Sequence, residues 1–77
     1  MGQGERMKRF GEKLRTLRQR RGWTLRELAI LLEMGAHSHL ANLETGKNMP
    51  TAELILKVAE LFAVSTDQLM KDELDLD

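Results

Sequence analysis

The fold is decided by residues 24–50, which read TLRELAILLEMGAHSHLANLETGKNMP. Thr24 is followed three residues later by Glu27, and this pair is the signature of a capping box, in which each side chain bonds the backbone N–H of the other residue. Leucines at helical spacing come next. The stretch therefore predicts a helix that starts after Thr24, a turn around Gly35 and a second short helix that starts near His37.

The second predicted helix, residues 37–44, has two different faces. At about 100° per residue, Leu40 and Leu43 point to the same side and define the inward direction. The opposite side is small and polar, with His37 and His39 at its two edges. It carries Ser38, Ala41, Asn42 and Thr45. Such a helix can pack on a core with one face and enter a groove with the other.

The whole chain predicts an all-α fold, because helical periodicity dominates and no segment alternates as a strand does. A first helix of about residues 7–21 would end at Gly22. It would bury Met7, Phe10, Leu14 and Leu17. Two more helices follow, one capped by Thr51 and one opened by Ser65, where Gln68 completes a second capping box. The first of these two carries inward Ala52, Ile55, Val58, Ala59 and Phe62. We expect five short helices around one core.

The chain length of 77 residues makes one small domain, with a core of about residues 7–71 and an acidic tail, residues 72–77, that we expect to be loose. The absence of cysteine excludes disulfides, thiolate metal ligands and a thiol nucleophile. No apolar run resembles a signal peptide or approaches the roughly 20 residues needed to cross a bilayer. We therefore expect a soluble cytoplasmic protein without membrane contact, and place any effector-binding or catalytic module on another chain.

The net charge is zero, but the charges are unevenly distributed. Residues 1–26 hold nine Lys and Arg against two Glu, a balance of +7, whereas residues 27–77 hold three Lys against ten acids, a balance of −7. The neutral total argues against a nucleic-acid partner, and the basic first third of the chain argues for one. Alternatively, these Arg and Lys side chains simply occupy the solvent-facing sides of the first helix.

Four segments carry a family resemblance. They are FGEKLR (residues 10–15), RGWTLRELA (21–29), ETGKNMP (44–50) and VSTDQL (64–69). In this order and spacing they resemble the phage-repressor type of helix-turn-helix, the family of lambda-like and Cro-like repressors. The resemblance implies a compact five-helix, lambda-repressor-like DNA-binding domain whose second and third helices form the helix-turn-helix. It also implies double-stranded DNA as the partner.

The resemblance assigns base reading to the outward face of the third helix, which in this family enters the major groove. The residues that inherit this role are His37, Ser38, Ala41 and Asn42. The Asn42 amide can donate to and accept from one base edge, a pairing that selects adenine, and Ala41 can meet a thymine methyl group. The alternative is a solvated helix face without a ligand.

Phosphate contacts are expected from residues around that helix. Lys47 and Asn48 follow it in the loop where the family touches the DNA backbone, and Gly46 fits there as the left-handed residue that ends the helix. Thr24 begins a helix whose free backbone donors favour an anion. His39, on the flank, would either touch a phosphate or pack beside the core.

A metal site is not expected, although two histidines lie close together. His37 and His39 are two residues apart and so diverge by about 200° around a helix. A zinc-binding helix spaces its histidines four residues apart. No cofactor is implied.

Arg18 and Glu44 fall where members of this family form an ion pair. The pair would link the first helix to the end of the third and hold the base-reading helix at a fixed angle. Its presence says little about net stability, but removal of one partner is costly.

Two departures from the family pattern affect these assignments. Leu25 stands where many relatives carry a glutamine that braces a base-reading residue or bonds a phosphate. Residues 33–36 hold one residue more than the commonest spacing, so either the preceding helix is longer or the loop bulges. Ala36 is also a poor helix N-cap, which leaves the base-reading register open by about one position.

Apolar residues beyond the needs of the core suggest a surface for self-association. They are Leu54, Leu56, Leu61 and Met70. A two-fold dimer would place two base-reading helices roughly 34 Å apart, one DNA turn, and would match a palindromic site. Alternatively, a small protein simply leaves some leucines exposed.

The sequence thus predicts a transcriptional regulator without enzymatic activity, which binds a short palindromic DNA site as a homodimer. Small proteins of this fold also include the controllers of restriction-modification operons and the antitoxin halves of toxin pairs. The competing hypothesis is a protein-interaction module that keeps the fold, favoured by net neutrality, Leu25 and the acidic tail. An enzyme is disfavoured, because no nucleophile-base pair, phosphate-binding loop or metal set is present. No small-molecule ligand can be inferred.

Overall fold

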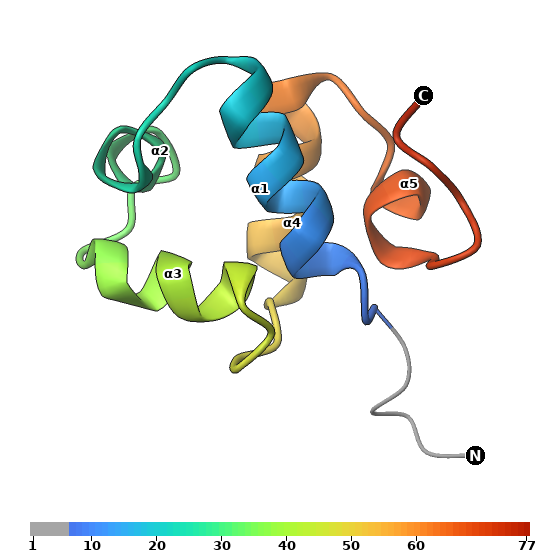
Figure 1. Ribbon diagram of the computed structural model, residues 1–77, viewed down its shortest axis with the longest axis horizontal. Helices are drawn as coiled ribbons and strands as arrows, with labels where there is room; N and C mark the ends of the chain where they lie inside the picture. Colours follow the sequence, from blue (N-terminus) through green and yellow to red (C-terminus); the bar gives the residue numbers. More distant parts are fainter. Residues whose placement is uncertain (1–6) are drawn as a thin grey trace.

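The computed structural model describes residues 7–77, and within them it contains five helices and no strand (Figure 1). In chain order these are α1 (Phe10–Arg20), α2 (Leu25–Leu31), α3 (His37–Glu44), α4 (Ala52–Phe62) and α5 (Thr66–Met70). The predicted all-α class and the order of the helices are confirmed. No helix in residues 7–77 is long and apolar enough to span a membrane.

The helix ends follow the predicted capping residues. The Thr24 hydroxyl accepts a hydrogen bond from the Glu27 N–H at 3.1 Å, and the Glu27 carboxylate accepts one from the Thr24 N–H at 2.7 Å. Ser65 and Gln68 form the same reciprocal pair at the start of α5. Thr51 caps α4 by accepting from the Leu54 N–H at 3.1 Å. These bonds satisfy backbone donors that have no partner within the helix.

The first helix is shorter than predicted at its start. Met7 has φ 59°, in the left-handed region, and α1 begins only at Phe10. The predicted stop is correct, because Gly22 has φ 69° and its N–H donates to the Gln19 carbonyl at 3.0 Å. Met7 still packs on the core from outside the helix, as a half-buried side chain.

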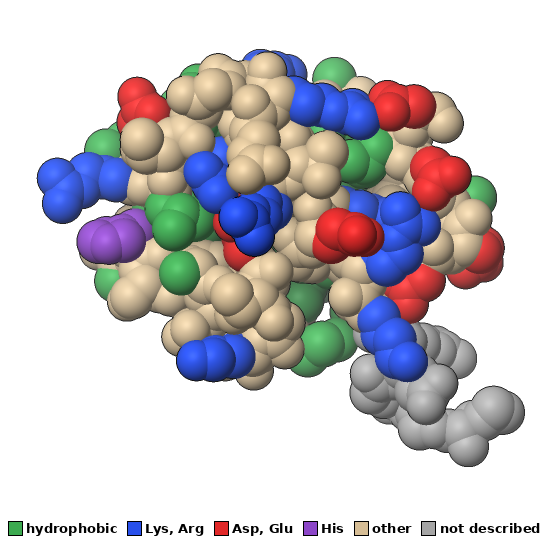
Figure 2. Space-filling model, in the orientation of Figure 1, with side chains coloured by type: hydrophobic (Ala, Val, Ile, Leu, Met, Phe, Trp, Pro, Cys, Tyr) green, Lys and Arg blue, Asp and Glu red, His purple; other side chains and the backbone are tan. Residues whose placement is uncertain are grey.

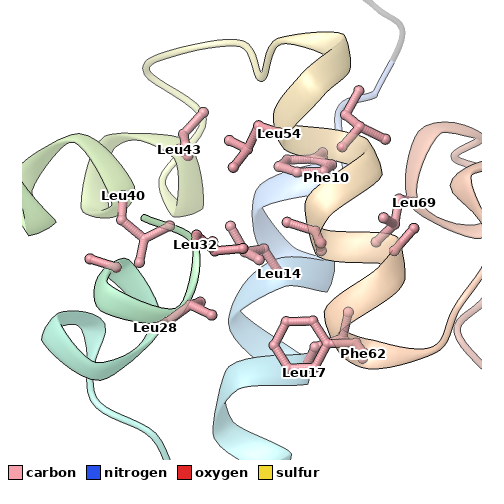
Figure 3. Packing of buried hydrophobic residues seen from close by; sticks show 14 residues of the cluster. Phe10, Leu14, Leu17, Leu28, Leu32, Leu40, Leu43, Leu54, Phe62 and Leu69 are labelled. Atoms are coloured by element: carbon pink, nitrogen blue, oxygen red, sulfur yellow. The ribbon is translucent and has the colours of Figure 1, made fainter. Parts of the chain in front are cut away.

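One apolar cluster, drawn from all five helices, forms the core (Figure 3). Its members are Phe10, Leu14, Leu17, Leu28, Ala29, Leu32, Leu40, Leu43, Leu54, Ile55, Val58, Ala59, Phe62 and Leu69. The prediction that Ala52 points inward is wrong, since it is exposed at the first turn of α4. Leu54 lies inside instead, 8% exposed, and Figure 3 shows it pointing into the cluster from α4.

The burial of Leu54 corrects part of the predicted dimer surface. A side chain that fills the core of its own domain cannot contact a second copy. Leu61 is half-buried and packs against the same cluster, so it too is mostly used within the domain. Leu56 and Met70 remain exposed, at 53% and 40%.

The acidic tail is not loose, contrary to the prediction. The Asp72 carboxylate accepts the backbone N–H groups of Lys8 and Arg9, each at 3.0 Å. The Asp77 carboxylate accepts two hydrogen bonds from Arg20, at 2.7 and 3.0 Å. These bonds fasten residues 72–77 along α1, and the apolar side chain of Leu76 packs on the core beneath them.

Lys13 explains why the tail docks where it does. Its side chain is buried, and its Nζ donates to three backbone carbonyls, those of Gln68 at 2.6 Å, Lys71 at 2.8 Å and Leu74 at 2.7 Å. The three acceptors use all three N–H bonds of the ammonium group. Lys13 thereby ties α1 to the end of α5 and to the first turn of the tail.

Candidate nucleic-acid interface

The outward face of α3 is formed by the predicted base-reading residues. Leu40 and Leu43 are fully buried, as the helical spacing requires, which turns the opposite side to solvent. His37 and Ser38 are exposed there, and Ala41 and Asn42 are half-buried. No hydrogen bond within residues 7–77 uses the side-chain amide of Asn42, so both its donor and its acceptor are available to a ligand.

The extra residue between α2 and α3 lies in the loop and not in a longer helix. Glu33 adopts φ 60°, and the Met34 N–H donates to the Ala29 carbonyl at 2.8 Å. This is the usual way in which a left-handed residue closes a helix, although glycine is the common choice at that position. The chain then reaches α3 at His37, and Ala36 caps the helix without any side-chain hydrogen bond.

The position of α3 is held by the ion pair between Arg18 and Glu44. The Arg18 guanidinium donates from Nε at 2.7 Å and from Nη2 at 3.1 Å to the two carboxylate oxygens of Glu44. Its third nitrogen donates to the Trp23 carbonyl at 2.8 Å. The hydrogen bonds to Glu44 also raise the pKa of Arg18. One side chain of α1 therefore joins the end of α3 to the residue just before the Thr24 cap of α2.

Gly11 permits a close approach of α1 and α3. A Cβ atom at this position would lie less than 3.0 Å from the carbonyl oxygens of Leu43 and Glu44. The last turn of α3 thus rests directly on the backbone of α1, about two helical turns before Arg18. The two contacts together fix both the distance and the angle of α3.

The loop after α3 folds back on the helix end. Gly46 has φ 85°, as predicted for the left-handed residue there, and the Lys47 N–H donates to the Asn42 carbonyl at 2.9 Å. Asn48 Nδ2 lies 3.4 Å from Nδ1 of His39. His39 is exposed, so the expectation that it packs beside the core is wrong. Lys47 is exposed as well, and no carboxylate in residues 7–77 pairs with it.

Thr24 is engaged within its own helix but keeps one donor. Its hydroxyl oxygen accepts the Glu27 N–H, while its O–H proton remains available to an anion. The Glu27 carboxylate lies at the same helix start, where it bonds the Thr24 N–H. This negative charge weakens the attraction of that end of α2 for a phosphate.

The acidic side chains are distributed unevenly over the surface. In Figure 2, Lys and Arg side chains are spread over the whole visible face, whereas most Asp and Glu side chains gather toward the end that carries α5. No group of three or more His, Asp or Glu side chains within residues 7–77 is arranged to hold a metal ion.

The pattern of a helix-turn-helix domain family matches residues 9–71, nearly the whole described chain. The chain belongs to this helix-turn-helix family. Its similarity extends to the transcriptional regulator ImmR of Bacillus subtilis strain 168, with 38% identity over 65 residues. That match covers 83% of this chain and 50% of ImmR, so the chain spans about half the length of this curated relative.

Solved structures of other proteins superpose on most of this chain. The restriction-modification controller protein C.AhdI from Aeromonas hydrophila is 28% identical with a TM-score of 0.71, over 82% of this chain and 94% of that one. The N-terminal DNA-binding domain of SinR from Bacillus subtilis is 27% identical with a TM-score of 0.71, over 79% of this chain and 88% of that one.

Two features of α1 were missed by the sequence analysis, the buried side chain of Lys13 and the close backbone contact at Gly11. Lys13 lies three residues after Phe10 and four before Leu17, on the buried stripe of α1, and this spacing was the available signal. Gly11 falls inside the helix predicted for residues 7–21, where glycine is unfavourable and so indicates a close backbone contact. Neither pattern identifies the residues that Lys13 and Gly11 contact, because each contact joins segments far apart in the chain.

Proposed function

We propose that this chain is a sequence-specific DNA-binding transcriptional regulator that inserts α3 into the major groove. The observation that carries the proposal is the outward face of α3, small and polar, with a free amide at Asn42 and a fixed orientation set by Arg18 and Glu44. Membership of the helix-turn-helix family supports it. Occupancy of a site near a promoter would change access or recruitment of the polymerase.

Base recognition is assigned to four side chains on that face. Asn42 forms a bidentate pair with adenine, and each good pair of this kind contributes roughly 1–3 kcal/mol of discrimination. His37 and Ser38 bond base edges near the start of α3, and Ala41 meets a thymine methyl group. The absence of a side-chain cap at Ala36 keeps the first backbone N–H groups of this helix accessible.

Phosphate contacts surround the helix and set its register on the duplex. Lys47 and Asn48 leave the end of α3 in an exposed loop, and the Thr24 hydroxyl lies at the start of α2. Nδ1 of His39 lies 3.4 Å from Nδ2 of Asn48, so the two side chains would contact the same segment of the DNA backbone. Leu25 contributes no polar contact here, unlike the glutamine of many relatives.

We further propose a homodimer that matches a palindromic operator. With Leu54 inside the core, the surface is reduced to Leu56 of α4 and Met70 of α5, which belong to two helices that pack on each other. A two-fold pair would present two copies of α3 roughly 34 Å apart. The likeness to the restriction-modification controller protein C.AhdI supports a regulator of this type.

A second candidate function is a protein-interaction module without specific DNA binding, favoured by the zero net charge. Binding of the purified chain to a fluorescent random-sequence duplex, measured over a series of salt concentrations, separates the two. A DNA-binding regulator loses affinity with a slope near −0.9 in log K against log salt for each neutralised phosphate. Absence of any salt-dependent duplex binding would favour the protein-interaction module.

A further inference from the structure

The fold neutralises part of the basic excess of the first third of the chain. Arg9 pairs with Glu12 at 3.0 Å and Asp75 at 3.1 Å, and Arg20 pairs with Asp77 at 2.7 Å. Lys13 is buried under the tail, and Arg18 is used by Glu44. These cations already have partners, and three of the four lie under or beside the acidic tail.

A small group of cations has no carboxylate partner within residues 7–77. The side chains of Arg15, Arg26 and Lys47 are all exposed and make no hydrogen bond or ion pair there. Arg21 also lacks a carboxylate, but its guanidinium lies over the rings of Trp23 and Phe62, at 5.3 and 5.4 Å from their centroids. An exposed cation without an internal partner keeps its full attraction for an external anion.

Arg15 belongs to the side of α1 that meets α3. It lies four residues after Gly11, which the end of α3 approaches, and three residues before Arg18, which pairs with Glu44. Residues at these spacings share one side of a helix. Arg15 therefore flanks the junction of α1 and α3, away from the residues of α1 that bind the tail.

Arg26 lies on α2, whose start is joined to the end of α3 through Arg18. It lies in the first turn of α2, three residues after Trp23, whose carbonyl is bonded by Arg18. The guanidinium of Arg18 therefore brings the start of α2 and the end of α3 together. Lys47 follows the end of α3 in the chain and is the third of these cations without a carboxylate partner within residues 7–77.

We propose that Arg15 and Arg26 bind DNA backbone phosphates beside α3, together with Lys47. The inference rests on the proposed function, since it requires α3 to face a duplex. Arginine suits the role because its guanidinium can donate two parallel hydrogen bonds to one phosphate. The two contacts would fix the register of α3 without reading sequence. The acidic tail pairs with neither of these two arginines. It pairs instead with Arg9 and Arg20, which would otherwise compete for the phosphates.

The test is the salt dependence of duplex binding by the full chain, compared for wild type, Arg15→Gln, Arg26→Gln and the control Arg20→Gln. All three variants lose one positive charge, so a general effect of net charge is the same in each. Arg15→Gln and Arg26→Gln should each lower the magnitude of the slope by about 0.9, one phosphate contact. Arg20→Gln should keep the wild-type slope. Far-UV circular dichroism melts would verify that the variants are folded.

The outcomes separate the inference from the proposed function. Wild type without salt-dependent duplex binding would refute the proposed function. A normal wild-type slope that Arg15→Gln and Arg26→Gln both retain would overturn the inference alone. An equal loss of slope in Arg20→Gln would also overturn it, because net charge would then explain the effect. A loss in one variant only would remove the other arginine from the phosphate contacts.

Discussion

The ion pair between Arg18 and Glu44 joins α1 to the end of α3, and Arg18→Met tests how strongly it holds this helix. Methionine keeps most of the aliphatic stem but leaves the Glu44 carboxylate, 6% exposed, without its two guanidinium donors. It also removes the donor to the Trp23 carbonyl. Breaking a buried ion pair from one side costs roughly 3–5 kcal/mol. Because the Arg18 side chain is still 14% exposed, we expect the lower part of this range, about 3 kcal/mol in the free energy of unfolding.

The assay is urea unfolding at neutral pH, followed by circular dichroism and by the fluorescence of Trp23, the only tryptophan. Its ring lies 5.6 Å from that of Phe62, so it reports on the packing of the core. A double-mutant cycle with Glu44→Gln isolates the pair itself, and we expect a coupling free energy of about 2 kcal/mol, within the usual range for residues in contact. A coupling below about 0.5 kcal/mol, the level of independent sites, would refute the idea that this pair fixes α3.

Four further predictions follow from individual positions. Ala63 has φ 57° at the end of α4, so Ala63→Gly should stabilise the chain by about 0.5–1 kcal/mol in urea unfolding, whereas the control Ala52→Gly should not. Gly11→Ala should destabilise by about 1–3 kcal/mol despite the better helix propensity of alanine, because its Cβ meets the carbonyl oxygens at the end of α3; a more stable variant would contradict this contact. The backbone N–H groups that bond Asp72 lower its pKa, so this stabilisation is present above about pH 4 and is lost as the pH falls through the lower pKa of the folded state; tail resonances in NMR spectra that stay unchanged in acid would exclude it. Asn42→Ala should change the preferred DNA sequence and leave the melting temperature unchanged, and an unaltered preference would mean that the register of α3 is wrong.

Local signals predicted the helices well. The capping boxes at Thr24 and Ser65 and the left-handed glycines Gly22 and Gly46 depend on neighbours within a few residues, so the sequence contains all the information that they need. The inward positions of Leu40 and Leu43 follow from helical spacing in the same way. The predicted face of α3 therefore coincides with the exposed face in the structure.

Contacts between distant segments cannot be predicted from local sequence patterns. The burial of Lys13 depends on three carbonyls that lie 55 to 61 residues further along the chain. The tail was predicted to be loose because acidic side chains usually point into solvent. In the structure, Asp72 accepts the Arg9 N–H and Asp77 accepts hydrogen bonds from Arg20. Leu54 was placed outside because apolar spacing alone could not decide which edge of α4 faces the core.

The central claim is that α3 reads DNA sequence, and selection from a random duplex library with the purified full chain tests it most directly. At moderate salt, we predict enrichment of a two-fold symmetric motif whose half-sites lie about one helical turn apart. Each half-site should contain an adenine that is no longer selected by Asn42→Ala. Retained DNA without any enriched motif would contradict the claim.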